Sequence, residues 1–499
     1  MGRWNIAKRI LGCAVAAGLT VLALGAAAGM LQRKDSDFKY RPYFTQEADF
    51  DVLFFGTSHV INGIFPMELW KDYGIVSYNF GGHGNELATS YWVMRNALDY
   101  TDPKLVVIDG LNLGSDVKTY ANFSNIHQSL DVFPISRTKI AAASDLLDDP
   151  VMDENIAAGL VGDAAQRTKM SLLWDFTIYH SRWNGLGQAD FASDCTKEKG
   201  AESRIAVSVP DEIPYVPADE KLEGETAGTR YLRRMIKECQ SRGIQVLLTY
   251  LPFPSTKEQQ QEANRIGELA LAYDVEYINF LDMDLVDYDT DCYDPNSHLN
   301  PSGARKVTDF LGSYIMEHYK VADQRTHKAY EDWHKDYEAY QTFKEENLKQ
   351  QGTADVYLML LADKNYNALI EIKDPALWES DYYNAFFENL GIDTVKAAAA
   401  DADCLFVKGG SQADDLSTAD QKARTEYGTF VYKKLPAQEG FSMNLNQTEL
   451  YRINTEQAES EAMHISVFEK DTMRLVDHAG FAVSDTNENT HINLNKIQN

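Results

Sequence analysis

The chain has 499 residues, which is long for a single hydrophobic core, so two or three domains are expected. Its 47 basic and 75 acidic residues give a formal net charge of −28 without a local basic patch, which argues against a nucleic-acid partner. The five cysteines are scattered and include no Cys-x-x-Cys pair, so neither a zinc site nor a disulfide framework is predicted.

The first part of the chain carries a long apolar segment. An uncharged run extends from Ile10 to Leu31, with three basic residues before it and two directly after it. As a helix, these residues would span about 33 Å, enough for a bilayer core of about 30 Å. The leading charges would stay in the cytoplasm. Residues 1–34 therefore predict a single-pass anchor in the cell membrane with an extracytoplasmic body. Because Ala26-Ala27-Ala28 resembles a cleavage site, secretion after signal cleavage is the alternative.

Apolar strand-like runs alternate with helical patterns after this segment, which indicates an α/β domain over residues 35–325 with a parallel sheet covered by helices. Residues 113–228 interrupt the alternation and are interpreted as a large insertion that caps the active-site edge. The predicted strands are 51–55, 76–80, 104–109, 244–251 and 275–281, and the predicted helices are 67–73, 86–98, 229–242, 257–273 and 301–319.

The pattern changes again in the last third of the chain. Residues 326–351 are charged and aromatic and predict a helical linker, and residues 352–499 predict an accessory α+β domain for binding or positioning. Within the accessory domain, a helix is expected at 376–390 and a terminal hairpin at 475–481. Its strands are expected at 356–362, 368–372, 404–407, 429–434 and 464–468.

The first candidate for chemistry is a serine that follows a buried strand. The apolar run that starts at Asp51 leads directly into Gly56-Thr57-Ser58-His59. A small hydroxyl residue in this position lies at the carboxyl edge of an α/β sheet, where ligands bind. Ser58 could attack an acyl carbon there, although Gly-Thr-Ser is also ordinary loop chemistry.

A second candidate segment lies far downstream. Asp294 and His298 stand four residues apart before a helical run, and together with a serine they supply the hydroxyl, imidazole and carboxylate of a charge-paired nucleophile. Because Asp294 precedes Pro295, an extended loop is expected around it. Asp291 is the alternative carboxylate.

These segments resemble the SGNH/GDSL hydrolase superfamily over roughly residues 48–318. The resemblance is carried by Gly56-Thr57-Ser58-His59, Gly81-Gly82-His83-Gly84-Asn85, Asp109-Gly110-Leu111-Asn112 and the segment from Asp294 to Gly303. Thr57 and His59 depart from the family pattern, and the Asp–His spacing is four instead of three. The resemblance implies a three-layer, flavodoxin-like domain. Within the superfamily, the chain looks most similar to membrane-anchored proteins of alginate acetylation and teichoic-acid D-alanylation.

The resemblance implies roles for individual residues. Ser58 would be the nucleophile, His298 the base and Asp294 its orienting carboxylate, without a cofactor. The oxyanion donors would be the N–H groups of Ser58 and Gly82 and the side-chain amide of Asn112. Since no His-x-x-x-His spacing is present, no metal site is expected. Substrate contacts are expected instead from His59, His83, His180 and Arg182.

The resulting hypothesis is an exported serine esterase or O-acyltransferase of the SGNH/GDSL type. Its partners would be an acylated glycan or envelope polymer, the membrane through the apolar segment, and a membrane acyl-transfer protein implied by the resemblance. Hydrolysis and transfer use the same residues and stay open as alternatives. A non-catalytic envelope-assembly or glycan-binding protein is the alternative from a different class.

Overall fold

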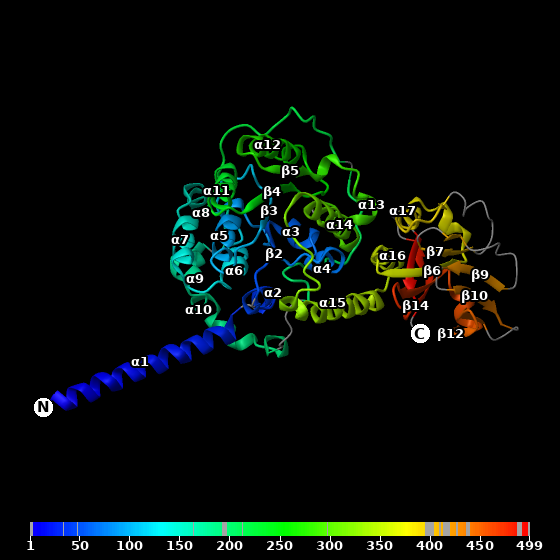
Figure 1. The fold of residues 1–499 in the computed structure, drawn as a ribbon, viewed down its shortest axis with the longest axis horizontal. Helices are drawn as coiled ribbons and strands as arrows, with labels where there is room; N and C mark the ends of the chain where they lie inside the picture. Colours follow the sequence, from blue (N-terminus) through cyan, green and yellow to red (C-terminus); the bar gives the residue numbers. More distant parts are fainter. Residues whose placement is uncertain are drawn as a thin grey trace. The chain divides into compact units, whose positions relative to one another are not determined.

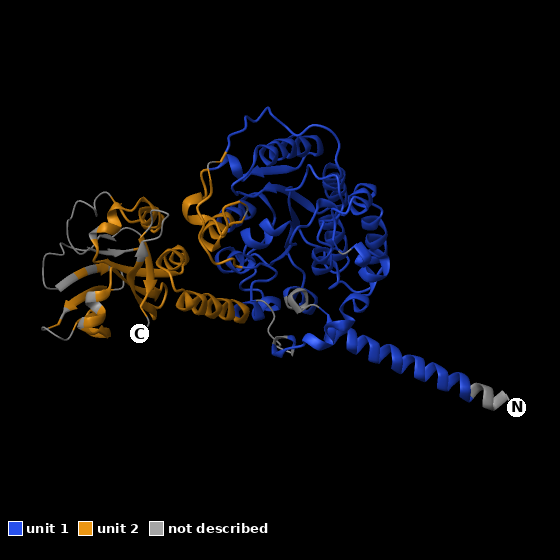
Figure 2. Ribbon diagram, turned by 180° about the vertical axis from the view of Figure 1, so that it is seen from behind, with its two compact units in different colours: residues 1–202, 214–283, 308–334 blue, residues 203–213, 284–307, 335–499 orange. Residues whose placement is uncertain are grey.

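The computed structural model describes residues 3–32, 34–46, 48–162, 164–191, 197–211, 213–296, 298–394, 404–408, 411–412, 420–425, 428–435, 440–486 and 492–497. The chain forms two compact units, coloured separately in Figure 2. The first unit comprises Met1–Glu202, Pro214–Met283 and Thr308–His334, and the second comprises Ser203–Ile213, Asp284–Val307 and Lys335–Asn499. The segment with Asp294 and His298 thus groups with the C-terminal part of the chain, and each unit is described by itself.

The apolar N-terminal segment is a helix, as the sequence predicts. Helix α1 (Arg3–Leu31) contains a stretch, Lys8–Leu31, of 24 residues with a mean hydropathy of 2.2. Its length and composition suit a signal sequence or a membrane anchor equally well. A second helix, α2 (Lys34–Thr45), follows it.

The first unit is built on a five-stranded sheet in the order β2-β1-β3-β4-β5, with every neighbouring pair parallel (Figure 1). This arrangement confirms the predicted α/β domain and its strand positions to within two residues. The strand order reverses between β1 and β3, and ligands bind at the carboxyl ends of strands at such a point. The strands are β1 (Val52–Gly56), β2 (Ser77–Gly81), β3 (Leu105–Asp109), β4 (Gln245–Tyr250) and β5 (Glu276–Asn279).

Helices connect these strands, and their sequences explain why they form. Helix α11 (Ala227–Ser241) starts with a capping box between Thr226 and Thr229, and its apolar side chains recur every three to four residues to bury one face. It packs against α5. The short α3, which begins at Ser58, was not predicted, because six residues carry no periodicity. The other connecting helices are α3 (Ser58–Gly63), α4 (Pro66–Tyr73), α5 (Leu87–Ala97), α12 (Lys257–Tyr273) and α14 (Pro301–His318).

Where the structure describes it, the segment predicted as an insertion contains short helices up to residue 191, whereas residues 197–211 and 213–226 form neither helix nor strand. The short helices are α6 (Ser124–Leu130), α7 (Arg137–Leu147), α8 (Pro150–Ala157), α9 (Lys169–Leu173), α10 (Phe176–Tyr179) and the 3₁₀ turns η1 (Ala164–Gln166), η2 (His180–Gly185) and η3 (Gln188–Phe191).

The second unit contains separate antiparallel sheets, which confirms the expected strand-rich C-terminal region. A six-stranded sheet has the order β15-β14-β13-β6-β7-β8, and a four-stranded sheet has the order β12-β11-β10-β9. Their strands are β6 (Tyr366–Ile372), β7 (Cys404–Val407), β8 (Ser411–Gln412), β9 (Asp420–Thr425), β10 (Gly428–Lys434), β11 (Phe441–Leu445), β12 (Thr448–Ile453), β13 (Met463–Glu469), β14 (Leu475–Thr486) and β15 (Ile492–Lys496).

Two predicted elements of this unit are wrong. The terminal hairpin expected at 475–481 is a single strand, because all of these residues lie in β14 (Leu475–Thr486). Residues 356–362 do not form a strand, because Ala354–Leu361 is helix α16. A short, continuous apolar run fits a buried helix as well as a buried strand, so its periodicity could not separate the two. The predicted helix at 376–390 is present as a 3₁₀ turn, η6 (Pro375–Glu379), followed by α17 (Asp381–Asn389), and the predicted linker contains α15 (Glu331–Gln350).

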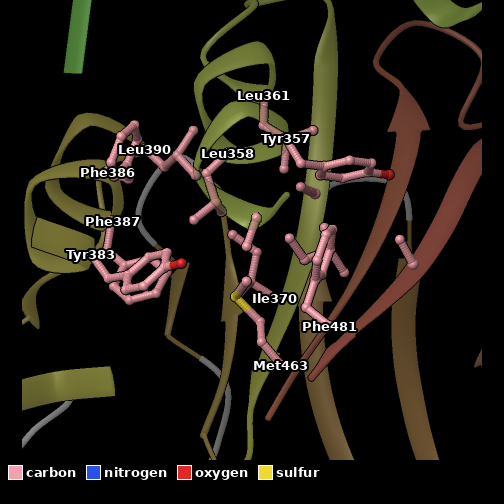
Figure 3. Close-up of a cluster of buried hydrophobic side chains, with 14 of the residues drawn as sticks. Tyr357, Leu358, Leu361, Ile370, Tyr383, Phe386, Phe387, Leu390, Met463 and Phe481 are labelled. Atoms are coloured by element: carbon pink, nitrogen blue, oxygen red, sulfur yellow. The ribbon is translucent and has the colours of Figure 1, made fainter. Parts of the chain in front are cut away.

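The core of the second unit lies between these helices and the larger sheet. Figure 3 shows Tyr357 and Leu361 of α16 facing Ile370 of β6 and Phe481 of β14, with Phe386 of α17 nearby. All five side chains are at most 1% exposed. Burial of this kind contributes about 1.5–3 kcal/mol for each large apolar side chain.

Candidate active site

The turn after β1 places Ser58 at the carboxyl edge of the parallel sheet. Thr57 is the N-cap of α3, and its hydroxyl accepts the backbone N–H of His59 at 3.2 Å. Ser58 is therefore the first helical residue directly after the strand. The His59 ring packs against the ring of Phe253 with centroids 4.4 Å apart, and its Nδ1 lies 3.1 Å from the Thr57 hydroxyl. These contacts help to hold the turn, and a substrate contact of His59 stays a prediction.

The loop after β2 lies against this turn. A Cβ atom on Gly81 would lie 2.7 Å from the carbonyl oxygen of Thr57 and 2.7 Å from the backbone nitrogen of Ile61, so only glycine fits. The backbone N–H of Gly82 donates to the carbonyl of Gly56 at 3.1 Å. This N–H would have to leave Gly56 before it could serve as an oxyanion donor, so the expected role of Gly82 stays a prediction.

Asn85, which the sequence analysis did not assign a role, has the buried amide that suits an oxyanion donor. Its side chain is 2% exposed, and its Oδ1 accepts the hydroxyl of Ser129 at 2.9 Å. Within the described residues, its Nδ2 has no hydrogen-bond partner. A Cβ atom on Gly82 would lie 2.0 Å from this Nδ2, which places the amide against the loop that is bonded to Gly56. In the sequence, the only signal for a role of Asn85 is its place at the end of the block Gly81-Gly82-His83-Gly84-Asn85.

Asn112 makes a contact that the sequence did not predict, and its expected role as an oxyanion donor stays a prediction. Its backbone is left-handed, with φ of 69°, and its Nδ2 donates to the backbone carbonyl of Asn85 at 3.3 Å. The side chain thus ties the loop after β3 to the loop after β2. Asn85 replaces Asn112 as the better candidate for the side-chain oxyanion donor.

A buried lysine and a histidine–carboxylate pair contact the loop after β2. Lys39 is 3% exposed, and its Nζ donates to the carbonyl of Gly81 at 2.8 Å. His83 Nε2 lies 3.4 Å from a carboxylate oxygen of Glu202, so this histidine is associated with a carboxylate, and its predicted substrate contact is untested. The part of the chain that the structure describes contains no group of three or more His, Cys, Asp or Glu residues arranged to hold a metal ion.

Three carboxyl groups contact the loops at this edge of the sheet: Glu86 and Asp109 are buried, and Glu262 of α12 is partly buried. Burial raises the pKa of Asp109, Glu86 and Glu262 to about 7 each. Asp109 accepts the N–H groups of Leu111 at 3.3 Å and Leu251 at 2.9 Å, which joins the loops after β3 and β4. Glu262 accepts the N–H of Gly114 at 3.0 Å. Such raised pKa values are typical of functional sites, although structural networks also produce them.

The raised pKa of Glu86 predicts a measurable pH dependence. Because the folded state binds this proton more tightly than the unfolded state, the stabilisation is complete below about pH 4 and is lost as the pH rises through 7. Glu86→Gln is therefore expected to remove about 2 kcal/mol of the difference in unfolding free energy between pH 5.5 and pH 8. Urea unfolding followed by tryptophan fluorescence measures this difference. The exposed-site variant Glu223→Gln should behave as wild type, and an unchanged pH dependence in Glu86→Gln would refute the assignment.

The close contact at Gly81 gives a second prediction. Gly81→Ala is expected to destabilise the first unit by about 1–3 kcal/mol, because the new methyl group would overlap backbone atoms on both sides of Ser58. Differential scanning calorimetry of the full chain measures the effect. The control Gly162→Ala adds a methyl group with no atom within 4 Å and should change stability by less than about 0.5 kcal/mol. Equal stabilities for the two variants would contradict the packing of this turn.

In the second unit, His298 is paired with Asp294. Its Nδ1 lies 2.6 Å from Asp294 Oδ2, and the other oxygen, Oδ1, accepts the backbone N–H of Asn296 at 3.1 Å. An antiparallel bridge between Cys292 and Leu299 closes the loop around this pair. The segment is a loop, as expected before Pro295, and it still brings the imidazole and the carboxylate together despite the four-residue spacing.

Asp291, the alternative carboxylate, has other partners. It is fully buried, and its Oδ2 accepts the ammonium of Lys306 at 2.7 Å and the backbone N–H of Asp287 at 2.9 Å. Asp291 therefore stabilises the fold around the loop, and Asp294 is the carboxylate that orients His298.

The structure places His180 and Arg182 beside helix α1. Arg182 donates to the carbonyls of Leu31 and Gln32 and pairs with Asp190 at 2.6 Å. His180 is exposed, with its Nδ1 3.1 Å from the carbonyl of Thr177. These contacts do not support the substrate-binding roles predicted for His180 and Arg182.

No protein-family model, no curated protein and no solved structure matches this chain. The function is therefore inferred from the chemistry of the residues described above.

Proposed function

We propose that this protein is a membrane-anchored, exported serine esterase or O-acyltransferase with an SGNH/GDSL-type, flavodoxin-like domain. The observation that carries the proposal is the 2.6 Å contact between His298 Nδ1 and Asp294. A carboxylate on Nδ1 fixes the tautomer and stabilises the imidazolium, so that Nε2 can take the proton of a serine hydroxyl. The position of Ser58 directly after β1 supports its role as that serine.

In the proposed mechanism, Ser58 Oγ attacks the carbonyl carbon of an acyl ester while His298 Nε2 accepts the hydroxyl proton. The ester C–O bond then breaks, and His298 returns the proton to the leaving alcohol. Water or an acceptor hydroxyl resolves the acyl-Ser58 intermediate, with His298 as the base again. Asp294 stays ionised throughout and stabilises the imidazolium.

The tetrahedral intermediate needs donors for its negative oxygen. We assign this role to the backbone N–H of Ser58 and to Asn85 Nδ2, which is buried and lies against the neighbouring loop. A preorganised donor of this kind contributes about 3–4 kcal/mol to the stability of the transition state. The hydrogen bond from Ser129 to Asn85 Oδ1 orients the amide before substrate binds.

The proposed substrate is an acyl group on a cell-surface polysaccharide or a related envelope polymer. The apolar helix α1 supports an extracytoplasmic site through its length and the basic residues that precede its apolar part. A membrane acyl-transfer protein would supply the donor if the reaction is transfer.

One observation favours a second function from a different class. The N–H of Gly82 is bonded to Gly56, so one expected oxyanion donor is already engaged. A non-catalytic envelope-assembly or glycan-binding protein would have no need of that donor. Binding of an acylated oligosaccharide without turnover would support this alternative.

A chromogenic acetyl ester tests the proposal. Purified full-length protein in detergent is incubated with p-nitrophenyl acetate, with and without an acceptor oligosaccharide. Release of p-nitrophenol without acceptor indicates hydrolysis, and acceptor-dependent release with an acetylated product indicates transfer. Absence of both products together with absence of an acyl-enzyme would overturn the enzymatic function.

A further inference from the structure

A short aromatic-rich segment of the first unit is attached to the end of helix α1. Helices α9 and α10 and the turn η2 span residues 169–185, here named the aromatic segment. Figure 1 shows α10 beside the end of α1, and both α10 and η2 contact that helix. Arg182 Nη1 donates to the carbonyl of Leu31 at 2.8 Å and also to that of Gln32, while Asp190 holds its other terminal nitrogen.

These contacts fix the segment to one end of the apolar helix. The last carbonyls of a helix have no partner within the helix, and a cation there also interacts favourably with the helix dipole. Arg182 satisfies one of these carbonyls, that of Leu31, and also binds the carbonyl of Gln32 directly after the helix. Leu31 is 8% exposed, whereas the side chains from Lys8 to Ala26 are exposed, so the described side chains of α1 become buried at its C-terminal end.

The aromatic segment presents large apolar side chains to the outside. Trp183 is 67% exposed and Met170 is 58% exposed. Trp174 and Phe176 stack with ring centroids 5.2 Å apart and are only partly buried. Exposed apolar side chains that gather on one segment mark an interaction surface.

We propose that the aromatic segment binds the bilayer interface at the point where α1 leaves the membrane. The apolar stretch Lys8–Leu31 would extend about 36 Å as a helix, which puts its end at the headgroup level of a bilayer core of about 30 Å. Tryptophan and tyrosine side chains concentrate at that level, because they combine an apolar body with a polar tip. Continuity with α1 therefore selects the lipid interface as the occupant of this surface.

This inference rests on the proposed anchoring role of α1, and it gives Arg182 a positioning role in place of the substrate contact expected from the sequence. The arginine would hold the aromatic segment at a fixed height relative to the apolar helix. The first unit would then be attached to the membrane at two adjoining points, the helix and the segment.

Quenching by brominated lipid tests the inference. Full-length protein is reconstituted into vesicles of phosphatidylcholine brominated near the headgroup end of the acyl chains, and tryptophan fluorescence is compared with that in unbrominated vesicles. We expect Trp183→Phe to reduce the quenchable fluorescence clearly, by roughly the share of one tryptophan. The control Trp333→Phe removes a side chain that is 3% exposed in the core and should leave the quenchable fluorescence unchanged.

Flotation of the same vesicles distinguishes failure of the proposed anchor α1 from failure of the proposed interfacial aromatic segment. If the protein floats with the vesicles and Trp183→Phe leaves the quenching unchanged, the interfacial segment is refuted while the anchor stands. Failure to float would refute both the anchor and the segment. Because ester turnover is measured separately in detergent, its loss would bear on the proposed function alone.

Discussion

Ser58→Ala is expected to lower kcat/KM for ester cleavage by a factor of about 10⁴ to 10⁶, because the nucleophile and its base act as one unit. The serine hydroxyl is the group that forms the acyl-enzyme, and the methyl group of the alanine variant has no oxygen to replace it. Steady-state kinetics with a chromogenic ester measures the effect.

The serine variant needs a matched control and a folding test. Ser241→Ala removes an exposed hydroxyl at the end of α11 and should retain wild-type turnover. Unfolding midpoints of the two variants and the wild type should agree within about 2 °C, which excludes a loss of fold. Substantial turnover in Ser58→Ala would show that another group performs the chemistry.

Asp363→Asn is expected to destabilise the second unit by about 3–5 kcal/mol, because it leaves buried cations without their counter-charge. Asp363 is fully buried, and its carboxylate lies 2.8 Å from Lys344 Nζ and 3.5 Å from a guanidinium nitrogen of Arg305. Burial lowers the pKa of Lys408 to about 8, although the charge of Asp363 opposes this shift. Urea unfolding of the full chain, followed by circular dichroism, measures the loss.

An exposed aspartate provides the comparison for this substitution. Asp471→Asn lies on the surface of the same unit and should change stability by less than about 0.5 kcal/mol. The neighbouring cations hold the pKa of Asp363 well below its usual range, so its stabilisation is present above about pH 4 and is lost as the pH falls further. A loss below about 1 kcal/mol at pH 7 would mean that Asp363 is not the charge that stabilises this cluster.

The strands of the first unit could be predicted because their signal is local. The run Leu105-Val106-Val107-Ile108 is apolar and mostly β-branched, which is typical of a strand buried on both faces. The strand predicted at 356–362 was wrong, because its apolar residues form helix α16 (Ala354–Leu361), which packs against the six-stranded sheet. The difference lies in tertiary packing, which a short window of sequence does not contain.

In the candidate site, too, local sequence signals could be read from the sequence, whereas contacts between distant residues could not. Ser58 could be predicted because it directly follows a strand-like run. The Asp294–His298 pair could be predicted because its two residues are only four positions apart. The orientation of the Asn85 amide depends on Ser129, 44 residues away, and Glu262 accepts the backbone N–H of Gly114, 148 residues away. Contacts at such separations arise only when the chain has folded. The contacts of Arg182 with Leu31 and Gln32 could not be predicted for the same reason, since these residues lie 150 or more positions earlier in the chain, and the substrate contact of Arg182 stays a prediction.

Covalent labelling tests the central claim most directly. Full-length protein in detergent is treated with a fluorophosphonate, digested and analysed by mass spectrometry, with His298→Ala and Asp294→Asn as companion variants. The proposed mechanism predicts a single adduct on the peptide that contains Ser58, formed at least about 100-fold more slowly in both variants. Absence of an adduct on Ser58, or equal labelling rates in the three proteins, would contradict the assignment of Ser58, His298 and Asp294 as a catalytic unit.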